Sequence, residues 1–345
     1  MKFEKYNDIE NGYRERFINE IRKTVPSDEV FVALNKIDGS QFSFYVDDNE
    51  VRVSKRSCLI NSKDNFNGSD KIFEKYHDRM KDLLEIVREN YRSYNLKFPY
   101  VIQSIVVDCE IFGGSYPHPE VERVQGAKVV QGRVFYTPFN DIAAYDLRIG
   151  YGINDGDFEY QYLPWDLAMR FLMMCDIPMT TTMASGTLDQ MLNLNPEFLD
   201  PTYIRYKLPL IENNFSEGYV IKPLHQEYKT NHGERVIFKH KNPKFAEKSK
   251  KTKVKTEIEM SEEAQNYLDE IISHVSDSRF ASVASKLTDE EKKNFSLLMK
   301  EMASDTLKDF GKDNPNWQDS ISKAEEKNIM KTLNKAIATI VQKNW

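Results

Sequence analysis

A lysine in a tight turn and a later pair of lysines are the residues of this sequence best suited to chemistry on phosphate. Lys36 opens segment 36–39, whose Asp-Gly pair is typical of a β-turn. A neutral lysine amine is a nucleophile that forms covalent intermediates. Lys239 and Lys241 alternate around His240 after an apolar run, so both should leave the same face of a strand. Two like charges held side by side favour an anionic partner, and a phosphate is the natural one.

Charge is distributed unevenly along the chain. The 345 residues carry a net charge of -6, which taken alone argues against a simple basic coat protein for nucleic acid. Residues 235–255, however, contain nine basic residues and one acidic residue, a net charge of +8 that leaves -14 for the remainder. The total therefore conceals a local site for phosphates. A solvated linker explains the 248–255 half of this segment equally well.

Segment 36–39 is the first of six elements that occur in a fixed order. The pattern Lys-x-Asp-Gly alone is weak, because chance produces it in roughly one chain in ten. The elements that follow are Lys55-Arg56, Glu110 within DCEIFGG, Ala144-Tyr145-Asp146, EGYVIKP from Glu217, and FKHK from Phe238. Their order and approximate spacing match the motifs of covalent nucleotidyltransferases, which carry AMP or GMP on a lysine.

The whole chain resembles the RNA ligase 2 family, the phage double-strand RNA ligases that include the trypanosome RNA-editing ligases. The similarity runs from the opening FEKY and IEN, through KHKNPKFAEK at residues 239–248, to segment 276–287 with Arg279. Family members seal 3'-OH/5'-phosphate nicks in duplex RNA with ATP and a divalent metal, in three nucleotidyl-transfer steps. The resemblance therefore implies AMP carried on Lys36, Mg²⁺ or Mn²⁺ as the metal, and nicked duplex RNA or an RNA:DNA hybrid as the partner.

The resemblance also implies a role for each motif residue. The catalytic residues would be Lys36, Lys239 and Lys241, the last two also disfavouring the charged form of the nucleophile. The nucleotide would be bound by Asn35, Ile37, Arg56, Glu110, Tyr145, Lys222, Lys239 and Lys241, with Arg56 and Glu110 at the ribose and Tyr145 stacked on the adenine. Glu217 would help to place the metal. RNA would contact Lys55, Asp146, Lys244, Lys248 and Arg279.

Plainer interpretations exist for some of these residues. Taken alone, Tyr145 could be interpreted as a core residue and Arg56 as a surface residue of a hairpin. Glu110 could be interpreted as the ion-pair partner of a structural arginine. The ordered set of motifs favours the functional interpretation.

Four positions depart from the family pattern. Asn35 stands where members usually have Glu, and Asp38 where they usually have His. Cys109 replaces the common Gly before the motif glutamate, and Tyr145 replaces a common Phe. Asp38 lies close to the chemistry, so it leaves the preference among RNA, hybrid and DNA duplexes open. It does not weaken the expectation of lysine adenylylation.

Two other functions compete with an RNA ligase. A small ATP-dependent DNA ligase shares the Lys-x-Asp-Gly pattern, but that enzyme, like a capping guanylyltransferase, would carry an OB-fold after the last motif. A non-catalytic RNA-binding paralogue should have lost the nucleophile or the paired lysines, and all three lysines are present.

The hydrophobic pattern predicts an α+β chain that positions these residues. Strand-like runs occupy residues 30–34, 42–46, 51–53, 101–107, 143–149, 219–221 and 236–238, and helical periods occupy 13–21, 72–91 and 164–175. Beyond residue 260 only helical periods occur, which excludes an OB-fold. We therefore expect a nucleotidyltransferase domain of antiparallel sheets with flanking helices at 1–247, a lysine-rich linker at 248–260, and an all-helical domain at 261–345.

Other function classes are disfavoured. No apolar run approaches the ~18 residues of a membrane span, and the charged N-terminal residues do not resemble a signal peptide. Three distant cysteines and six scattered histidines indicate neither a disulfide framework nor a zinc site. We expect a soluble monomer without a membrane partner, in the cytoplasm, or in the host cytoplasm if the gene is phage-borne.

Overall fold

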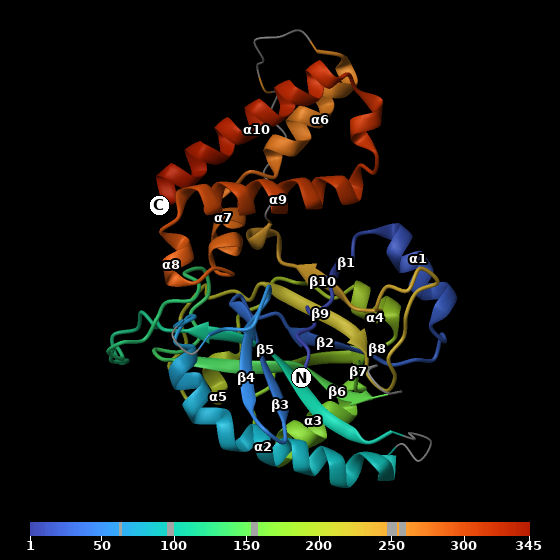
Figure 1. The fold of residues 1–345 in the computed structure, drawn as a ribbon, viewed down its shortest axis with the longest axis vertical. Coiled ribbons are helices and arrows are strands. Elements are labelled where there is room, and N and C mark those ends of the chain that lie inside the picture. Colours follow the sequence, from blue (N-terminus) through green and yellow to red (C-terminus); the bar gives the residue numbers. More distant parts are fainter. Residues whose placement is uncertain (62–63, 95–99, 153–157, 247–253, 255–259) are drawn as a thin grey trace. The chain divides into compact units, whose positions relative to one another are not determined.

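The computed structural model (Figure 1) describes residues 1–345 except 62–63, 95–99, 153–157, 247–253 and 255–259. Contacts divide the chain into two compact units, Met1–Lys244 and Phe245–Trp345, and each is described by itself. Of the predicted linker 248–260, only Val254 and Met260 are described, so its bounds stay a prediction.

Two five-stranded sheets form the frame of the first unit. In spatial order, the first sheet contains β1 (Glu10–Asn11), β10 (Phe238–Lys241), β9 (Gly218–Pro223), β2 (Phe31–Asn35) and β8 (Thr182–Gly186). The second contains β4 (Val51–Lys55), β3 (Ser40–Asp47), β5 (Ile102–Gly113), β6 (Asn140–Gly152) and β7 (Phe158–Tyr162). Every pairing is antiparallel except that of β1 with β10. The predicted antiparallel architecture is confirmed, although β10 begins two residues later than the apolar run that indicated it.

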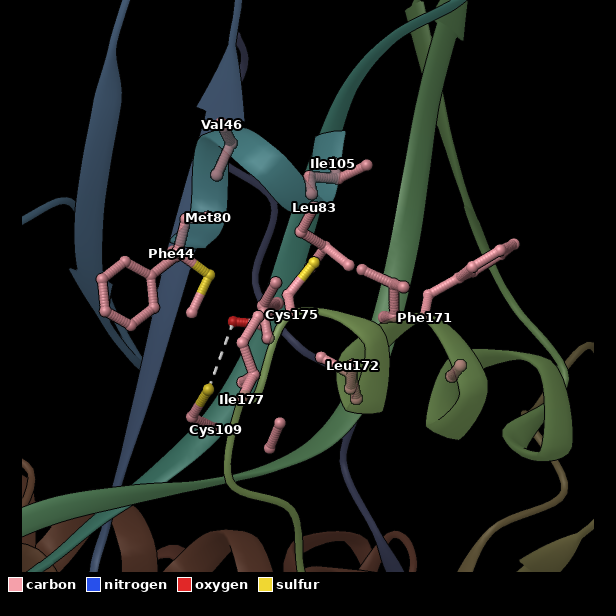
Figure 2. Packing of buried hydrophobic residues seen from close by; sticks show 14 of the residues in the cluster. Phe44, Val46, Met80, Leu83, Ile105, Cys109, Phe171, Leu172, Cys175 and Ile177 are labelled. Atoms are coloured by element: carbon pink, nitrogen blue, oxygen red, sulfur yellow. Dashed lines mark hydrogen bonds between the residues drawn. The ribbon is translucent and has the colours of Figure 1, made fainter. Parts of the chain in front are cut away.

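Two helices close the core of the second sheet. The predicted period produces α2 (Ser69–Tyr94), and α3 (Trp165–Met174) begins directly after Pro164. Their apolar faces pack with residues of β3, β5 and β6 in one cluster, and Figure 2 shows Met80 of α2 beside Phe44 of β3. Cys109 also points into this core, where its thiol contacts the Val107 carbonyl oxygen at 3.7 Å (Figure 2). Side chains alternate along a strand, so the next residue, Glu110, is directed to the opposite face.

Shorter helices cover the first sheet. The buried face of α1 (Glu15–Thr24) and Met191 of α4 (Leu188–Leu192) pack with β2, β9 and β10. A capping box of Thr187 and Gln190 begins α4. The short α5 (Thr202–Arg205) precedes β9, and η1 (Pro243–Phe245) follows β10.

The second unit is helical throughout its described residues. It contains α6 (Glu262–Ser273), α7 (Asp277–Ala284), α8 (Asp289–Lys292), α9 (Phe295–Asp313), η2 (Trp317–Ser320) and α10 (Lys323–Asn344). Leu268 and Ile271 of α6, Met302 and Phe310 of α9 and Ile337 of α10 are fully buried in one shared core. The predicted all-helical C-terminal domain, in place of an OB-fold, is confirmed. No helix in the described parts of the chain is long and apolar enough to cross a membrane.

Candidate active site

The turn that carries Lys36 is fixed by its neighbours on two strands. Lys36 follows the last residue of β2, and its backbone N–H donates to the Gly218 carbonyl oxygen on β9 at 2.9 Å. Gly39 lies so close to β5 that a Cβ atom there would be 2.3 Å from the Ile111 carbonyl oxygen. The glycine of the Lys-x-Asp-Gly pattern is therefore a steric requirement, since any side chain would push the turn away from β5.

Glu217 joins the nucleophile to one lysine of the later pair. Its carboxylate forms an ion pair with the Lys36 ammonium and a second one, at 2.9 Å, with the Lys241 ammonium. The backbone holds this geometry because Gly218 has a φ of +128°, and a Cβ atom there would lie 2.2 Å from the His240 carbonyl oxygen. Three motifs that are distant in sequence thus meet at one buried carboxylate.

Three carboxyl groups near Lys36 have different electrostatics. Burial would raise the pKa of Glu217, but Lys241 and Lys36 outweigh it and lower that pKa to about 2. Burial and the charge of Glu217 raise the pKa of Asp38 to about 6. Burial raises the pKa of Glu110 to about 8, helped by Glu217 and Asp38 and opposed by Lys36. At neutral pH Glu217 is therefore anionic and Glu110 is mainly protonated.

Asp38 has a partner that the sequence motifs did not indicate. Its carboxylate accepts two hydrogen bonds from Arg133, one of them from Nε at 3.0 Å. Its backbone N–H donates to the Tyr136 hydroxyl at 2.7 Å. Arg133 and Tyr136 both belong to the connection between β5 and β6. No periodicity marks such a pair, because its members are 95 residues apart.

The residues on either side of Lys36 are buried. The Asn35 amide donates to an Asp200 carboxylate oxygen at 2.8 Å, and its own oxygen accepts from the Ser216 hydroxyl at 2.6 Å. Ile37 is 5% exposed. In this structure both residues support the turn, and their predicted contact with the nucleotide stays a prediction.

Arg56 directly follows β4, and Glu110 lies on β5, with β3 between these two strands. The Arg56 guanidinium contacts the Asp8 carboxylate and, at 3.1 Å, the side-chain oxygen of Gln41. Gln41 on β3 is the register partner of Glu110 on β5. The arginine and the glutamate that are predicted to meet the ribose are therefore brought to the same region. Lys55, predicted to contact RNA, is 4% exposed at the end of β4.

A buried charge network surrounds Asp146. Its carboxylate is fully buried and accepts hydrogen bonds from Tyr6, from Lys222 at 2.6 Å and from both Nη atoms of Arg235 at 2.7 and 2.9 Å. Lys222 also donates to the Tyr145 carbonyl oxygen at 2.6 Å. The prediction that Asp146 contacts RNA does not fit this burial. Asp146 instead holds Lys222 and Arg235, and no sequence motif indicated a role for Arg235 beyond its charge.

Tyr145 precedes this buried aspartate and is only half-buried. Its ring meets that of Tyr6 edge to face, with centroids 5.2 Å apart. Backbone and ring contacts therefore hold the residue that is predicted to stack on adenine.

The remaining predicted residues lie in different surroundings. Lys239 is on β10 opposite Val220, two residues before Lys241 as the alternation requires. Lys244 is half-exposed, with its ammonium 3.4 Å from the Phe215 ring centroid. Lys248 lies outside the described residues.

Arg279, in the helical unit, is 1% exposed. It is paired with Asp305 and, at 2.8 Å, with Asp309. Its predicted contact with RNA does not fit this burial either, because both carboxylates already hold its guanidinium inside the unit.

Comparison with known proteins decides the family. The RNA ligase family model matches residues 29–241, which include Lys36, Glu217 and Lys241. The chain belongs to the RNA ligase family. A second family model, T4 RNA ligase 2 C-terminal, matches residues 257–339 and places this RNA ligase family member in the RNA ligase 2 group.

Curated relatives include the mitochondrial RNA-editing ligases of Trypanosoma brucei brucei. RNA-editing ligase 1 is 25% identical over 244 residues, which cover 64% of this chain and 50% of the relative. RNA-editing ligase 2 is 26% identical over 133 residues, which cover 38% of this chain and 30% of the relative. The matches thus span half or less of these relatives' length. The chain is also similar to a solved apo structure of a Naegleria gruberi RNA ligase mutant. The match covers 70% of this chain and 57% of the solved chain, with 15% sequence identity and a TM-score of 0.43.

The donor set near Lys36 suits a metal that is shared with substrate phosphates. Among the described residues no group of three or more His, Cys, Asp or Glu side chains is arranged to hold a metal by itself. Mg²⁺ is commonly held by one or two carboxylates together with substrate phosphates. Glu217 is anionic and now engages two ammonium groups, so it fits that arrangement once Lys36 moves away.

Proposed function

We propose that this RNA ligase family member is an ATP-dependent RNA ligase that seals 3'-OH/5'-phosphate nicks in duplex RNA or RNA:DNA hybrids. The observation that carries the proposal is the meeting of Lys36 and Lys241 at the buried Glu217 carboxylate. A reactive amine, a second fixed cation and an anionic group that can accept a cation are the parts that a nucleotidyl-transfer site needs.

Lys36 would act first, as the nucleophile. Its neutral amine attacks the α-phosphorus of ATP, a phosphorus–nitrogen bond forms, and the bond to the leaving pyrophosphate breaks. Lys36 must leave the Glu217 carboxylate and lose a proton before this step. Lys241 stays beside the site and offers its positive charge to the phosphate oxygens, where transferring phosphoryl groups concentrate negative charge.

Two later transfers would complete the reaction. The AMP moves from Lys36 to the 5'-phosphate at the nick, which forms a pyrophosphate linkage. The 3'-hydroxyl then attacks the 5'-phosphorus, a phosphodiester bond forms, and AMP leaves. Mg²⁺ or Mn²⁺, held by Glu217 together with substrate phosphates, would neutralise phosphate charge.

The nucleotide would lie between the Lys36 turn and the second sheet. Tyr145 offers a flat ring for adenine, and its backbone is fixed by Lys222. Glu110 is mainly protonated at neutral pH, so its carboxyl group can donate a hydrogen bond to a ribose hydroxyl. Arg56 is positioned in the same region by Gln41 and Asp8.

A nick-sealing assay tests this function. Wild-type protein, ATP and Mg²⁺ are incubated with the same nicked sequence built as RNA duplex, RNA:DNA hybrid and DNA duplex. We expect sealing of at least one RNA-containing duplex, none by Lys36→Ala, and normal sealing by Lys23→Ala, which changes an exposed lysine of α1. A wild-type protein that seals only DNA, or seals nothing while carrying AMP, would contradict the proposal.

A further inference from the structure

Asp38 poses an electrostatic difficulty for a site that must admit ATP. It lies two residues after Lys36, is 4% exposed, and occupies the position where the family pattern has His. The charges of Glu217, Arg133 and Lys36 act on its carboxyl group, and its own charge acts on Glu110. An anionic Asp38 beside the nucleophile would repel the triphosphate, because like charges repel each other strongly in a poorly solvated site.

Arg133 compensates the charge of Asp38 through two hydrogen bonds to its carboxylate. Its Nε and Nη2 atoms bind the two carboxylate oxygens of Asp38, the fork geometry in which arginine recognises carboxylates best. The arginine side chain is 23% exposed, whereas that of Asp38 is 3% exposed. Both members of the ion pair are thus largely shielded from solvent, and the carboxylate is shielded more completely than the arginine.

The connection that carries Arg133 is attached to the same turn a second time. Tyr136, 1% exposed, accepts the Asp38 backbone N–H, and its ring packs against Phe112 of β5 with centroids 5.2 Å apart. Arg133 therefore reaches Asp38 from an anchored backbone. An anchored arginine loses less conformational freedom when it pairs, so the contact is well suited to hold one geometry.

We propose that Arg133 is a positioning residue that neutralises Asp38 and so permits the polyphosphate of a nucleoside triphosphate to approach Lys36. This inference rests on the proposed function. The pair also connects residues 114–139 to the nucleophile turn, and Asp38 and Arg133 are expected to act as one unit. The chain keeps a carboxylate at the family's His position because it also supplies the matching guanidinium.

A double-mutant cycle tests the pair. The full chain is compared with Asp38→Asn, Arg133→Gln, Arg133→Lys and the double variant Asp38→Asn/Arg133→Gln. Lysyl-AMP formation is measured across ATP concentrations, and folding is monitored by thermal unfolding. Arg123→Gln, which changes an exposed arginine of the same connection, is the matched control.

Removing the arginine alone leaves a buried carboxylate uncompensated beside the phosphate path. We expect Arg133→Gln to raise the apparent KM for ATP by about tenfold or more. Arg133→Lys, which keeps the charge but not the fork, should lie between Arg133→Gln and wild type. The double variant, with both charges removed, should recover to within about threefold of Asp38→Asn. A purely structural role would lower the unfolding midpoint and leave the KM of the folded protein unchanged.

Three results would overturn the inference. They are a wild-type KM in folded Arg133→Gln, a double variant as impaired as Arg133→Gln, and an equal effect of Arg123→Gln. Failure of the proposed function is distinguishable, because it appears in the wild-type protein itself, which then forms no adenylate on Lys36 or seals no RNA-containing nick.

Discussion

Replacing Asp146 by alanine should destabilise the first unit strongly. The carboxylate is fully buried and receives four hydrogen bonds, from Tyr6, Lys222 and twice from Arg235. Although burial alone would raise the pKa of Asp146, Arg235 and Lys222 hold it far below its usual range. The substitution removes the anion that Lys222 and Arg235 share, while Arg235 keeps its ion pair with Glu227.

The magnitude follows from that geometry. Breaking one buried ion pair by deleting a partner costs about 3–5 kcal/mol, and here two buried cations lose the same partner, so the upper half of that range applies. For a unit of this size, each kcal/mol lowers the unfolding midpoint by about 2–4 °C. The expected decrease is therefore roughly 8–20 °C.

Calorimetric unfolding of the full chain checks this expectation. Asp146→Asn keeps the shape and loses the charge, and Asp78→Ala, which changes a 96% exposed side chain, is the control with an expected effect below about 0.5 kcal/mol. Because the folded-state pKa of Asp146 is depressed, its contribution is present above pH ~4 and is lost as the pH falls further. The difference between wild type and Asp146→Ala should thus shrink in acid. A midpoint within about 2 °C of wild type at neutral pH would refute the reasoning.

Three further outcomes are expected. Gly39→Ala should form no lysyl-AMP while keeping its helical circular dichroism, because the added Cβ would meet the Ile111 carbonyl oxygen at 2.3 Å; normal labelling would show that the turn tolerates a side chain. A fragment of residues 1–247 should keep adenylylation in a gel assay but seal nicks poorly, and equal sealing by fragment and full chain would exclude a role of the helical unit in gripping RNA. Chelation by EDTA should stop adenylylation and excess Mg²⁺ or Mn²⁺ should restore it, whereas metal-independent labelling would exclude the proposed role of Glu217.

That Lys36, Glu217 and Lys241 belong to one site could be anticipated from the sequence, although their direct ion pairs could not. Each belongs to a motif that adjoins a strong apolar strand, and strand alternation predicts which side chains leave one face together. The helical structure of the C-terminal unit could also be predicted, because the apolar residues between 264 and 275 recur with a helical period over three turns.

Other features depend on contacts that leave no periodic signal. Arg133 and Asp38 are joined across 95 residues by a loop, and an arginine in a loop has no pattern that names its partner. Asp146 and Arg279 were expected to contact RNA, yet both are buried in charge networks. Charged residues are seldom fully buried unless they are paired. A charged residue is therefore predicted to lie on the surface as long as its ion-pair partner is unknown, and sequence alone does not identify that partner.

The state of Lys36 in this structure also could not be anticipated. The expectation was that Lys239 and Lys241 would act on the nucleophile directly. The structure places the Glu217 carboxylate in contact with both Lys36 and Lys241. Because one carboxylate serves two ammonium groups, entry of ATP has to rearrange this cluster before Lys36 can attack.

The most direct test of the account is covalent labelling of Lys36. The protein is incubated with ATP labelled at the α-phosphate and with Mg²⁺, and the labelled peptide is identified by mass spectrometry. The account predicts one AMP per chain on Lys36 and no label in Lys36→Ala. A protein that takes up no label, or an Lys36→Ala variant labelled as strongly as wild type, would contradict it.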